Sequence, residues 1–386
     1  MPEARWDAFR RQMPAAAEWA YFDHAAVAPL PAPAAAAMIA WAREAAALGG
    51  AGWLEWKAVR EALRARAARL VGADVEEIAL VRSTTEGINL VAEGFPWRAG
   101  DNVVTLADEF PSNLYPWMNQ ARRGVETRRV PTDDGRVDLD RLADACDERT
   151  RVVSISWIGY ASGWRNDIGA VAEIAHRRGA LFFLDAIQGL GALPLDVRRS
   201  AVDFFAADGH KWLLGPEGAG LFYIRREHLD RLQPIGVGWN SVAHSSDFTH
   251  IELKFKNSAA RFEGGSSNMV GFAGLNASLE LLMSLDIATI GERILAVTDL
   301  ACRRLIEAGA TIASHREQPE HLSGIVLFDW PGRDPQFIRR QLFDRKILLS
   351  ARAGKLRISP HAYCNEADIE RLVEELKACP SVQPTS

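Results

Sequence analysis

Two side chains with complementary chemistry stand where strand-like runs of the sequence end. Asp185 follows the apolar run 181–184, and Lys211 comes shortly after the next run, 204–206. If the two runs are neighbouring parallel strands, their carboxyl ends lie at the same edge of a sheet and bring the two side chains together. Taken singly, Asp185 is equally explained by a helix cap or a structural ion pair, and Lys211 by a surface charge.

A third feature, the segment 82–95, predicts an anion site. Ser83 and Glu86 have the spacing of a capping box, so a helix is expected to begin here. Free N–H groups and the positive end of the helix dipole attract anions to such a terminus. Thr84 and Thr85 add two hydroxyl groups. A plain capped helix would explain the same residues.

Together, an amine, a carboxylate and an anion cradle match the needs of pyridoxal 5'-phosphate. Lys211 would form the Schiff base with its aldehyde, and Asp185 would keep the pyridine nitrogen protonated so that the ring accepts electrons. The turn GPEGAG, residues 215–220, would then lead the backbone sharply away from the cofactor. An aldolase that uses the lysine without a cofactor is an alternative, but it leaves the threonine-rich helix start unexplained.

Four sequence motifs together resemble those of a known family. They read STTEGIN (from Ser83), FFLDAIQG (from Phe182), DGHKWLLGPEGAGLFYI (from Asp208) and RFEGGSSN (from Arg261). As a set they resemble the class V aminotransferase family of fold-type I pyridoxal-phosphate enzymes. Cysteine desulfurases, selenocysteine lyases, isopenicillin N epimerase and kynureninase belong to this family. The resemblance extends from about Tyr21 to the last predicted helix.

The resemblance implies roles for individual residues. Lys211 is similar to the family's Schiff-base lysine, and His210 to the histidine that precedes it beside the phosphate. Ser266 resembles a hydroxyl that reaches the phosphate of the neighbouring subunit, which implies a homodimer. The full set of implied cofactor-binding residues is Asp185 at the ring nitrogen, Gln188 at the ring hydroxyl, Thr84 and Thr85 at the phosphate, Phe110, Asp208 and Ser266.

The resemblance also implies a small amino acid as substrate. Arg357 in KLRISPHAYCN is similar to the arginine that binds the substrate's α-carboxylate, because a guanidinium binds a carboxylate through two hydrogen bonds. His24 lies in a segment that crosses the site entrance in the family. Tyr160 is the third implied substrate-binding residue.

Several positions depart from the desulfurase pattern. Phe110 occupies the place of a histidine that stacks on the cofactor ring; a phenylalanine stacks but cannot carry a proton, and kynureninase-like relatives also have an aromatic ring there. Asp208 replaces a small hydroxyl residue near the phosphate. Tyr160 replaces an asparagine, which makes isopenicillin N epimerase-like relatives more similar at this point.

The departure with the largest consequence is a missing thiol. Desulfurases need an exposed cysteine thiolate on a loop of the C-terminal part, whereas residues 347–357 are short and contain no cysteine. Transamination, epimerisation and a direct C–S β-lyase reaction therefore stay open as activities. A desulfurase that uses Cys364 instead, and a non-catalytic protein that binds the cofactor for regulation, are the alternatives.

The wider sequence predicts an α/β fold. Expected strands at 102–106, 151–157, 180–184, 204–206 and 220–224 alternate with helical patterns at 86–94, 114–123, 139–146 and 170–178, which is typical of a mostly parallel, seven-stranded-type sheet covered on both faces. After residue 275 the pattern changes to helices at 275–284, 287–308 and 365–378 with strands at 323–329 and 356–359. We expect an N-terminal segment (1–20) that packs near the smaller domain and the site, a large cofactor domain (21–270) and a smaller C-terminal α+β domain (271–386).

The composition limits the classes of partner that the protein is expected to bind and the cellular compartment in which it is expected to work. The 386 residues carry a net charge of −5 with a pI near 6.0, which argues against nucleic acid and anionic membranes as partners. The four cysteines show no metal-binding spacing, so no metal site is expected, and a reducing compartment, the cytoplasm, is predicted. The N-terminal residues lack the apolar core of a signal peptide. The uncharged stretch 25–42 contains three prolines and is expected to form a turn and then a helix.

Overall fold

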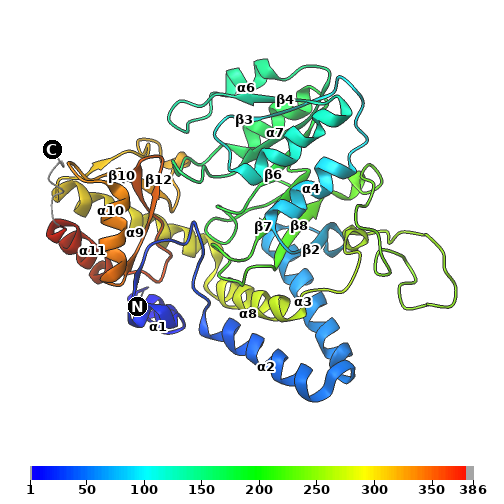
Figure 1. The fold of residues 1–386 in the computed structure, drawn as a ribbon, viewed down its shortest axis with the longest axis horizontal. Helices are drawn as coiled ribbons and strands as arrows, with labels where there is room; N and C mark the ends of the chain where they lie inside the picture. Colours follow the sequence, from blue (N-terminus) through cyan, green and yellow to red (C-terminus); the bar gives the residue numbers. More distant parts are fainter. Residues whose placement is uncertain (1, 380–386) are drawn as a thin grey trace.

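The computed structural model describes residues 2–379 and is built around two sheets (Figure 1). The larger sheet has seven strands in the order β2-β8-β7-β6-β5-β3-β4. Neighbouring strands are parallel except at β8, which runs antiparallel to both β7 and β2. The strands are β2 (Ile78–Val81), β3 (Asn102–Leu106), β4 (Glu126–Val130), β5 (Thr150–Ser156), β6 (Leu181–Asp185), β7 (Phe204–Asp208) and β8 (Gly220–Ile224). The prediction of a mostly parallel seven-stranded sheet is confirmed.

Helices cover both faces of this sheet. The effect is clear in strand β6, whose residues 181–184 are all apolar because both of its faces are buried. Phe182 and Leu184 belong to one core cluster, whereas Leu181 and Phe183 belong to the cluster on the other face. A strand buried on both sides needs apolar residues at every position. The helices around the sheet are α2 (Ala32–Leu48), α3 (Trp53–Val71), α4 (Thr84–Gly94), α5 (Tyr115–Met118), α6 (Leu139–Ala145), α7 (Ile168–Arg177) and α8 (Met269–Leu285).

The predicted elements are present, several of them with ends shifted by one to three residues, and two helices differ more clearly. The helix expected at 275–284 begins six residues earlier, because the Asn268 side chain caps it by accepting a hydrogen bond from the Gly271 N–H. The helix expected at 114–123 is the single α-helical turn α5 followed by a 3₁₀ segment, Asn119–Arg123.

The second sheet has four strands in the order β12-β13-β10-β9 and lies apart from the larger one in Figure 1. Its strands are β9 (Thr311–Ile312), β10 (Val326–Asp329), β12 (Ser350–Arg352) and β13 (Lys355–Ile358), and the helices beside it are α9 (Ile287–Glu307), α10 (Pro335–Asp344) and α11 (Glu366–Ala378). This part has the α+β character expected of the C-terminal region.

The N-terminal segment lies against this second part. It forms α1 (Pro2–Arg11) and the short strand β1 (Ala20–Tyr21), which pairs in parallel with β11 (Ile347–Leu348). Arg10 forms an ion pair with Asp368 on α11. The division at residues 20/21 and 270/271 stays a prediction, and residues 1 and 380–386 lie outside the described part of the chain.

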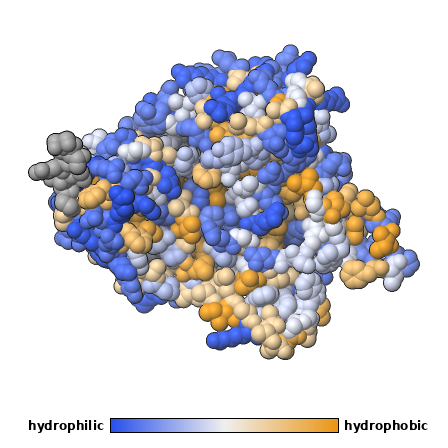
Figure 2. Space-filling model, viewed as in Figure 1, coloured by the Kyte–Doolittle hydropathy of each residue, from blue (hydrophilic) through white to orange (hydrophobic). Residues whose placement is uncertain are grey.

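The surface carries one conspicuous projection. The chain between β8 and α8 forms a long loop that extends away from the body, at the right of Figure 1, and Figure 2 shows much of its surface as hydrophobic. Its exposed apolar side chains are Val237, Trp239, Phe248, Ile251 and Leu253. Contiguous exposed apolar residues of this kind mark interaction surfaces.

Candidate active site

A cavity of about 300 Å³ opens where the parallel strands end. Strand β6 ends at Asp185 and β7 ends at Asp208, three residues before Lys211. Arg357, on β13 of the other sheet, lines the same cavity. The structure brings together ten of the twelve residues predicted from the sequence: Thr84, Thr85, Phe110, Tyr160, Asp185, Gln188, Asp208, His210, Lys211 and Arg357.

Asp185 is a buried carboxylate with few partners of its own. Its side chain accepts a hydrogen bond from the Ile187 N–H, at 3.1 Å. Burial raises its pKa to about 6, while that hydrogen bond and the nearby Lys211 favour the ionised form. A buried carboxylate of this kind is stabilised when a positively charged or protonated group is placed beside it.

The Lys211 amine is also buried, and its pKa is lowered to about 8. Burial is the largest cause, and Asp185 opposes the shift, while the guanidinium of Arg357 adds to it. The ammonium nitrogen lies 5.6 Å from the centre of the Phe110 ring. A neutral amine, which is the form that attacks a carbonyl, is therefore much more accessible than for an exposed lysine.

The backbone around Lys211 depends on glycine. A Cβ atom at Gly209 would lie 2.6 Å from the Ala219 carbonyl oxygen, and Gly218 has a φ of +79°. The chain therefore returns into β8 directly after the lysine. This agrees with the turn expected from the sequence.

Helix α4 points its N-terminus at the cavity. Ser83 is the N-cap and its side chain accepts a hydrogen bond from the Glu86 N–H, at 3.1 Å. The Glu86 carboxylate accepts from the Arg82 N–H rather than from the N-cap, so the box is only half formed. Thr85 donates to the Ser112 hydroxyl at 2.9 Å. The first N–H groups of a helix have no partner within it, so this end is a suitable anion site.

Thr84 and its neighbours tie the helix to β7. The Thr84 hydroxyl accepts a hydrogen bond from the Asp208 N–H, at 2.9 Å. The Asp208 carboxylate accepts from the Gly209 N–H at 2.7 Å. The His210 Nδ1 lies 3.1 Å from that carboxylate but outside hydrogen-bond geometry, and it is a buried nitrogen without an acceptor or donor among residues 2–379. The His210 Nδ1 thus has no hydrogen-bond partner among these residues, and His210 is one of the residues that line the cavity.

Two aromatic rings form one wall. Phe110 and Tyr160 meet edge to face, with ring centres 5.3 Å apart. The Phe110 ring is partly exposed and faces the Lys211 amine. A planar group attached to that amine would therefore lie beside the Phe110 ring.

Arg357 closes the cavity from the side of the smaller sheet. It is fully buried and donates from Nη2 to Asp23 at 3.0 Å and from Nη1 to the Tyr160 carbonyl at 2.6 Å. Its Nε–H has no acceptor among the described residues. A buried guanidinium with an unused donor is a site for an anionic ligand group.

Gln188 is held by two hydrogen bonds. Its amide nitrogen donates to the Ala25 carbonyl, and its oxygen accepts from the Trp212 indole, both at 3.0 Å. The Gln188 NH₂ group has a second hydrogen that these bonds do not use, and Gln188 lines the cavity.

His24 lies outside the cavity. Its ring is fully buried, and its two nitrogens bond the Ser359 carbonyl and the Tyr363 hydroxyl, at 2.9 and 2.8 Å. Burial lowers its pKa to about 4. The side chain that sequence reasoning assigned to substrate instead fixes the segment 23–28, whose Ala28 N–H donates to the His210 carbonyl at 2.7 Å.

Ser266 is exposed and lines a second, larger cavity of about 600 Å³. The two cavities share Ser83 and Thr85, so they meet at the start of α4. The structure therefore places Ser266 beside the candidate anion site rather than within the cavity of Lys211.

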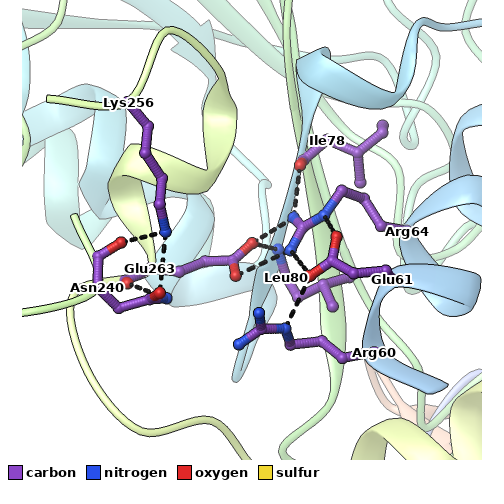
Figure 3. A network of polar contacts seen from close by, with 8 residues as sticks. All are labelled: Arg60, Glu61, Arg64, Ile78, Leu80, Asn240, Lys256 and Glu263. Atoms are coloured by element: carbon purple, nitrogen blue, oxygen red, sulfur yellow. Dashed lines mark hydrogen bonds and ion pairs between the residues drawn. The ribbon is translucent and has the colours of Figure 1, made fainter. Parts of the chain in front are cut away.

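A buried polar network holds the loop that carries Ser266 (Figure 3). Glu263 forms an ion pair with Arg64 of α3 and accepts a hydrogen bond from the Leu80 N–H of β2, at 2.8 Å. Asn240 donates to the Glu263 carbonyl at 2.9 Å, and Lys256 donates to the Asn240 side chain at 2.9 Å. Satisfied buried networks of this type fix one local conformation.

Sequence reasoning missed three residues at this site. Arg352 and Ser112 line the cavity, and Glu109 lies buried behind Phe110, where it accepts a hydrogen bond from the Ser156 N–H at 2.6 Å. Burial raises the pKa of Glu109 to about 8. The signals were weak: Glu109 and Ser112 flank Phe110 in the sequence, and Arg352 precedes Arg357 by five positions.

The residues present fit pyridoxal phosphate. Asp185 would hold the ring nitrogen, Lys211 the aldehyde carbon, and the start of α4 with His210 the phosphate. The partly unpaired Asp185, the unpartnered Nδ1 of His210 and the free helix terminus each leave a polar group for such a ligand.

A comparison with protein-family models decides the family. The model described as aminotransferase class V matches residues 20–372. The chain belongs to this family. The resemblance seen in the motifs is confirmed, and a member of this family is a pyridoxal-phosphate-dependent enzyme.

Two of the matching relatives are described as cysteine desulfurases. A probable cysteine desulfurase of Methanothermobacter thermautotrophicus is 32% identical over 97% of this class V chain and 98% of its own length. A cysteine desulfurase of Escherichia coli is 35% identical, over 60% of the chain and 58% of its own length. An uncharacterized aminotransferase of Bacillus subtilis, YcbU, is 27% identical over 85% of the chain and 86% of its own length.

Solved structures show the same fold. The apo cysteine desulfurase of Thermococcus onnurineus NA1 has a TM-score of 0.87 and 26% identity, and 96% of this chain and 97% of that one are covered. The cystine C–S lyase C-DES, in complex with its reaction product cysteine persulfide, has a TM-score of 0.88 and 25% identity over 95% and 99% of the two chains. A lysine-to-alanine mutant of C-DES has glycine covalently linked to the cofactor. The cofactor of this class V enzyme is pyridoxal phosphate.

The lowered pKa of Lys211 predicts how the apoenzyme takes up its cofactor. Since the neutral amine attacks the aldehyde, the rate of uptake should rise by roughly 50-fold between about pH 6 and pH 8 and then level off. Stopped-flow absorbance after mixing apoenzyme with pyridoxal phosphate measures this rate. A rate that keeps rising to pH 10, as for an exposed lysine, would contradict the assigned environment of the amine.

Proposed function

We propose that this class V enzyme removes the proton from the α-carbon of a small amino acid, with Lys211 as the base and without a cysteine nucleophile. The observation that supports this best is the placement of the buried Lys211 amine in one cavity with Asp185 and Arg357. The first two residues suit the cofactor and the third suits the substrate's carboxylate.

Each residue of the cavity would have a separate role, which follows from its position. Arg357 would bind the α-carboxylate, and Phe110 would pack against the cofactor ring. Lys211 Nζ would then accept the α-proton, with its lowered pKa placing it near the operating pH. When bound, pyridoxal phosphate supplies an electron-accepting ring in conjugation with the substrate nitrogen.

Asp185 would keep a proton on the ring nitrogen, because a carboxylate in a buried site favours a proton or a cation beside it. His210 and the N-terminus of α4 would bind the phosphate, with Thr84 and Thr85 contributing hydroxyls. His24 would position the segment 23–28 across the entrance rather than touch substrate.

Three outcomes follow from α-proton removal. They are transamination, epimerisation and elimination of a sulfur substituent from the β-carbon. The likeness to the cystine C–S lyase C-DES favours elimination as the second, more specific candidate. Such a lyase needs no thiol of its own.

The cysteines of this chain support a route without a thiol. All four are buried, and none of them lines the cavity of residues 83–357 described above. Cys364 contacts the Tyr21 carbonyl, and burial raises its pKa far above the ordinary value. A thiolate, which is the reactive form, is not available there.

Replacing Cys364 by alanine should therefore leave product formation from L-cystine or L-cysteine within about twofold of the unmodified enzyme. Sulfide and pyruvate assays measure this, with Cys302→Ala as the matched buried control. A loss of sulfide release in Cys364→Ala alone would favour a desulfurase that uses an atypical thiol.

We also propose a cytoplasmic homodimer. The exposed apolar loop between β8 and α8, and the cavity of Ser266 that adjoins the start of α4, support a second copy as partner. Unpaired cysteines suit a reducing compartment. Within residues 2–379, every helix is too short or too polar to cross a membrane.

One experiment tests the function as a whole. Holoenzyme is titrated with a panel of L- and D-amino acids while the visible absorption of the bound cofactor is recorded, and the products are identified as keto acid, D-isomer or sulfide. Sedimentation of the same preparation gives the mass of the assembly. A protein that binds the cofactor but responds to no amino acid would contradict the proposal and leave a regulatory binding protein.

A further inference from the structure

We infer that the substrate of this site carries a second anionic group on its side chain, and that Arg352 recognises that group. This inference rests on the proposed function, because it takes Arg357 as the partner of the α-carboxylate. It assigns the substrate to small amino acids with a carboxylate, sulfinate or sulfonate side chain.

A single hairpin of the smaller sheet carries both arginines. Strands β12 and β13 pair so that Ser350 lies opposite Arg357 and Arg352 lies opposite Lys355. Directly opposed residues of an antiparallel pair share a face, and so do residues two apart along a strand. Four polar side chains, Ser350, Arg352, Lys355 and Arg357, therefore line one face of this hairpin, and Arg352 and Arg357 reach the cavity.

One of the three basic side chains on this face has no acidic partner among the described residues. Lys355 pairs with Asp329, and Arg357 pairs with Asp23. Arg352 donates to the carbonyl of Ala351, at 2.9 Å, and no acidic side chain of residues 2–379 forms an ion pair with it. Its charge also contributes to the lowered pKa of Arg357, so the two guanidinium groups are close.

Arg352 comes from a different part of the fold than the candidate phosphate site. The candidate phosphate site lies at the start of α4, on the larger sheet, whereas Arg352 and Arg357 come from the smaller sheet. A ligand group that meets Arg352 is thus on the substrate side of the cavity. At about 300 Å³, the cavity admits only a short side chain beyond the cofactor.

A tight turn joins strands β12 and β13. Only Ala353 and Gly354 connect them, with φ values of +47° and +71°. The short connection holds Arg352 at the mouth of the cavity, in the stretch 347–357 that contains no cysteine. The turn thus fixes the backbone that carries Arg352, and an exposed guanidinium, rather than a cysteine, lines the cavity here.

The test compares acidic and neutral amino acids of the same shape. Holoenzyme is titrated with L-aspartate, L-asparagine, 3-sulfino-L-alanine and L-alanine, and dissociation constants are taken from the absorbance of the bound cofactor. We expect the acidic ligands to bind about 10- to 100-fold more tightly than the neutral ones, the effect of a charge-assisted hydrogen-bond pair. Arg352→Gln should remove this preference, and the affinity for L-alanine should change far less than the affinity for the acidic ligands.

Two further variants sharpen the result. Arg352→Lys keeps the charge but not the paired donors, so it should retain part of the preference. Arg339→Gln on α10 removes an exposed arginine outside the cavity and should change nothing.

Each other outcome overturns the inference in a distinct way. Equal binding of aspartate and asparagine, or an equal loss for all ligands in Arg352→Gln, would remove the proposed specificity. Loss of the cofactor from Arg352→Gln would place this side chain at the phosphate. No response to any amino acid would overturn the proposed function as well, whereas a response to neutral amino acids alone would overturn only the inference.

Discussion

The Lys211→Ala variant should lose the visible absorption band of the bound cofactor and at least about 10⁴-fold of kcat/KM. The same amine is expected to hold the cofactor aldehyde and to accept the α-proton, so its removal eliminates both contributions. The variant should fold, because alanine is tolerated in a turn whose geometry depends on Gly209 and Gly218 rather than on the lysine side chain. Absorbance spectra of purified protein and steady-state kinetics measure the two effects.

A matched control uses a lysine outside the cavity. Lys254→Ala changes a residue of the exposed loop and should keep the spectrum and the rate. Lys211→Arg keeps a positive charge near Asp185 but cannot form a Schiff base, so it should behave as Lys211→Ala does. An unchanged absorption band in Lys211→Ala would show that another amine holds the cofactor and would remove the basis of the proposed function.

The inner strands of the larger sheet were predictable from the sequence because they are buried on both faces. The runs 102–106 and 220–224 coincide with β3 and β8, and both strands are buried at every position. Edge strand β4, Glu126–Val130, was missed, because its sequence ETRRV is largely charged and only its last residue is buried. Its place is set by pairing with β3, which no local pattern reveals.

The sequence predicted those site residues that the order and direction of the strands bring together. Asp185 and Lys211 follow parallel strands, so the sheet alone brings them to one edge. Arg352 and Glu109 depend on contacts between distant segments: one on a hairpin of the smaller sheet that faces the larger one, the other on a hydrogen bond to β5. His24 shows the reverse error, because its polar side chain is used within the protein by Ser359 and Tyr363.

The second large effect is expected at Asp185. Asp185→Asn should retain bound cofactor, because Lys211 and the start of α4 are unchanged, but should lower kcat/KM by about 10²- to 10³-fold. An amide of the same shape cannot stabilise a proton on the ring nitrogen, so the electron-accepting capacity of the cofactor falls. Kinetics together with the pH dependence of the cofactor absorbance measure this, since a merely structural defect would not shift the titration of the ring.

Glu109→Gln is the matched control for this prediction. Glu109 is a second buried carboxyl near Asp185, and burial raises its pKa to about 8, so near pH 7 it is largely a neutral acid. A glutamine keeps both contacts, accepting from the Ser156 N–H and donating to the Ser156 hydroxyl. Its effect should therefore be far smaller than that of Asp185→Asn. Equal losses in the two variants would show that the site needs buried carboxyl shape rather than the charge of Asp185, and the assignment of Asp185 to the ring nitrogen would then be wrong.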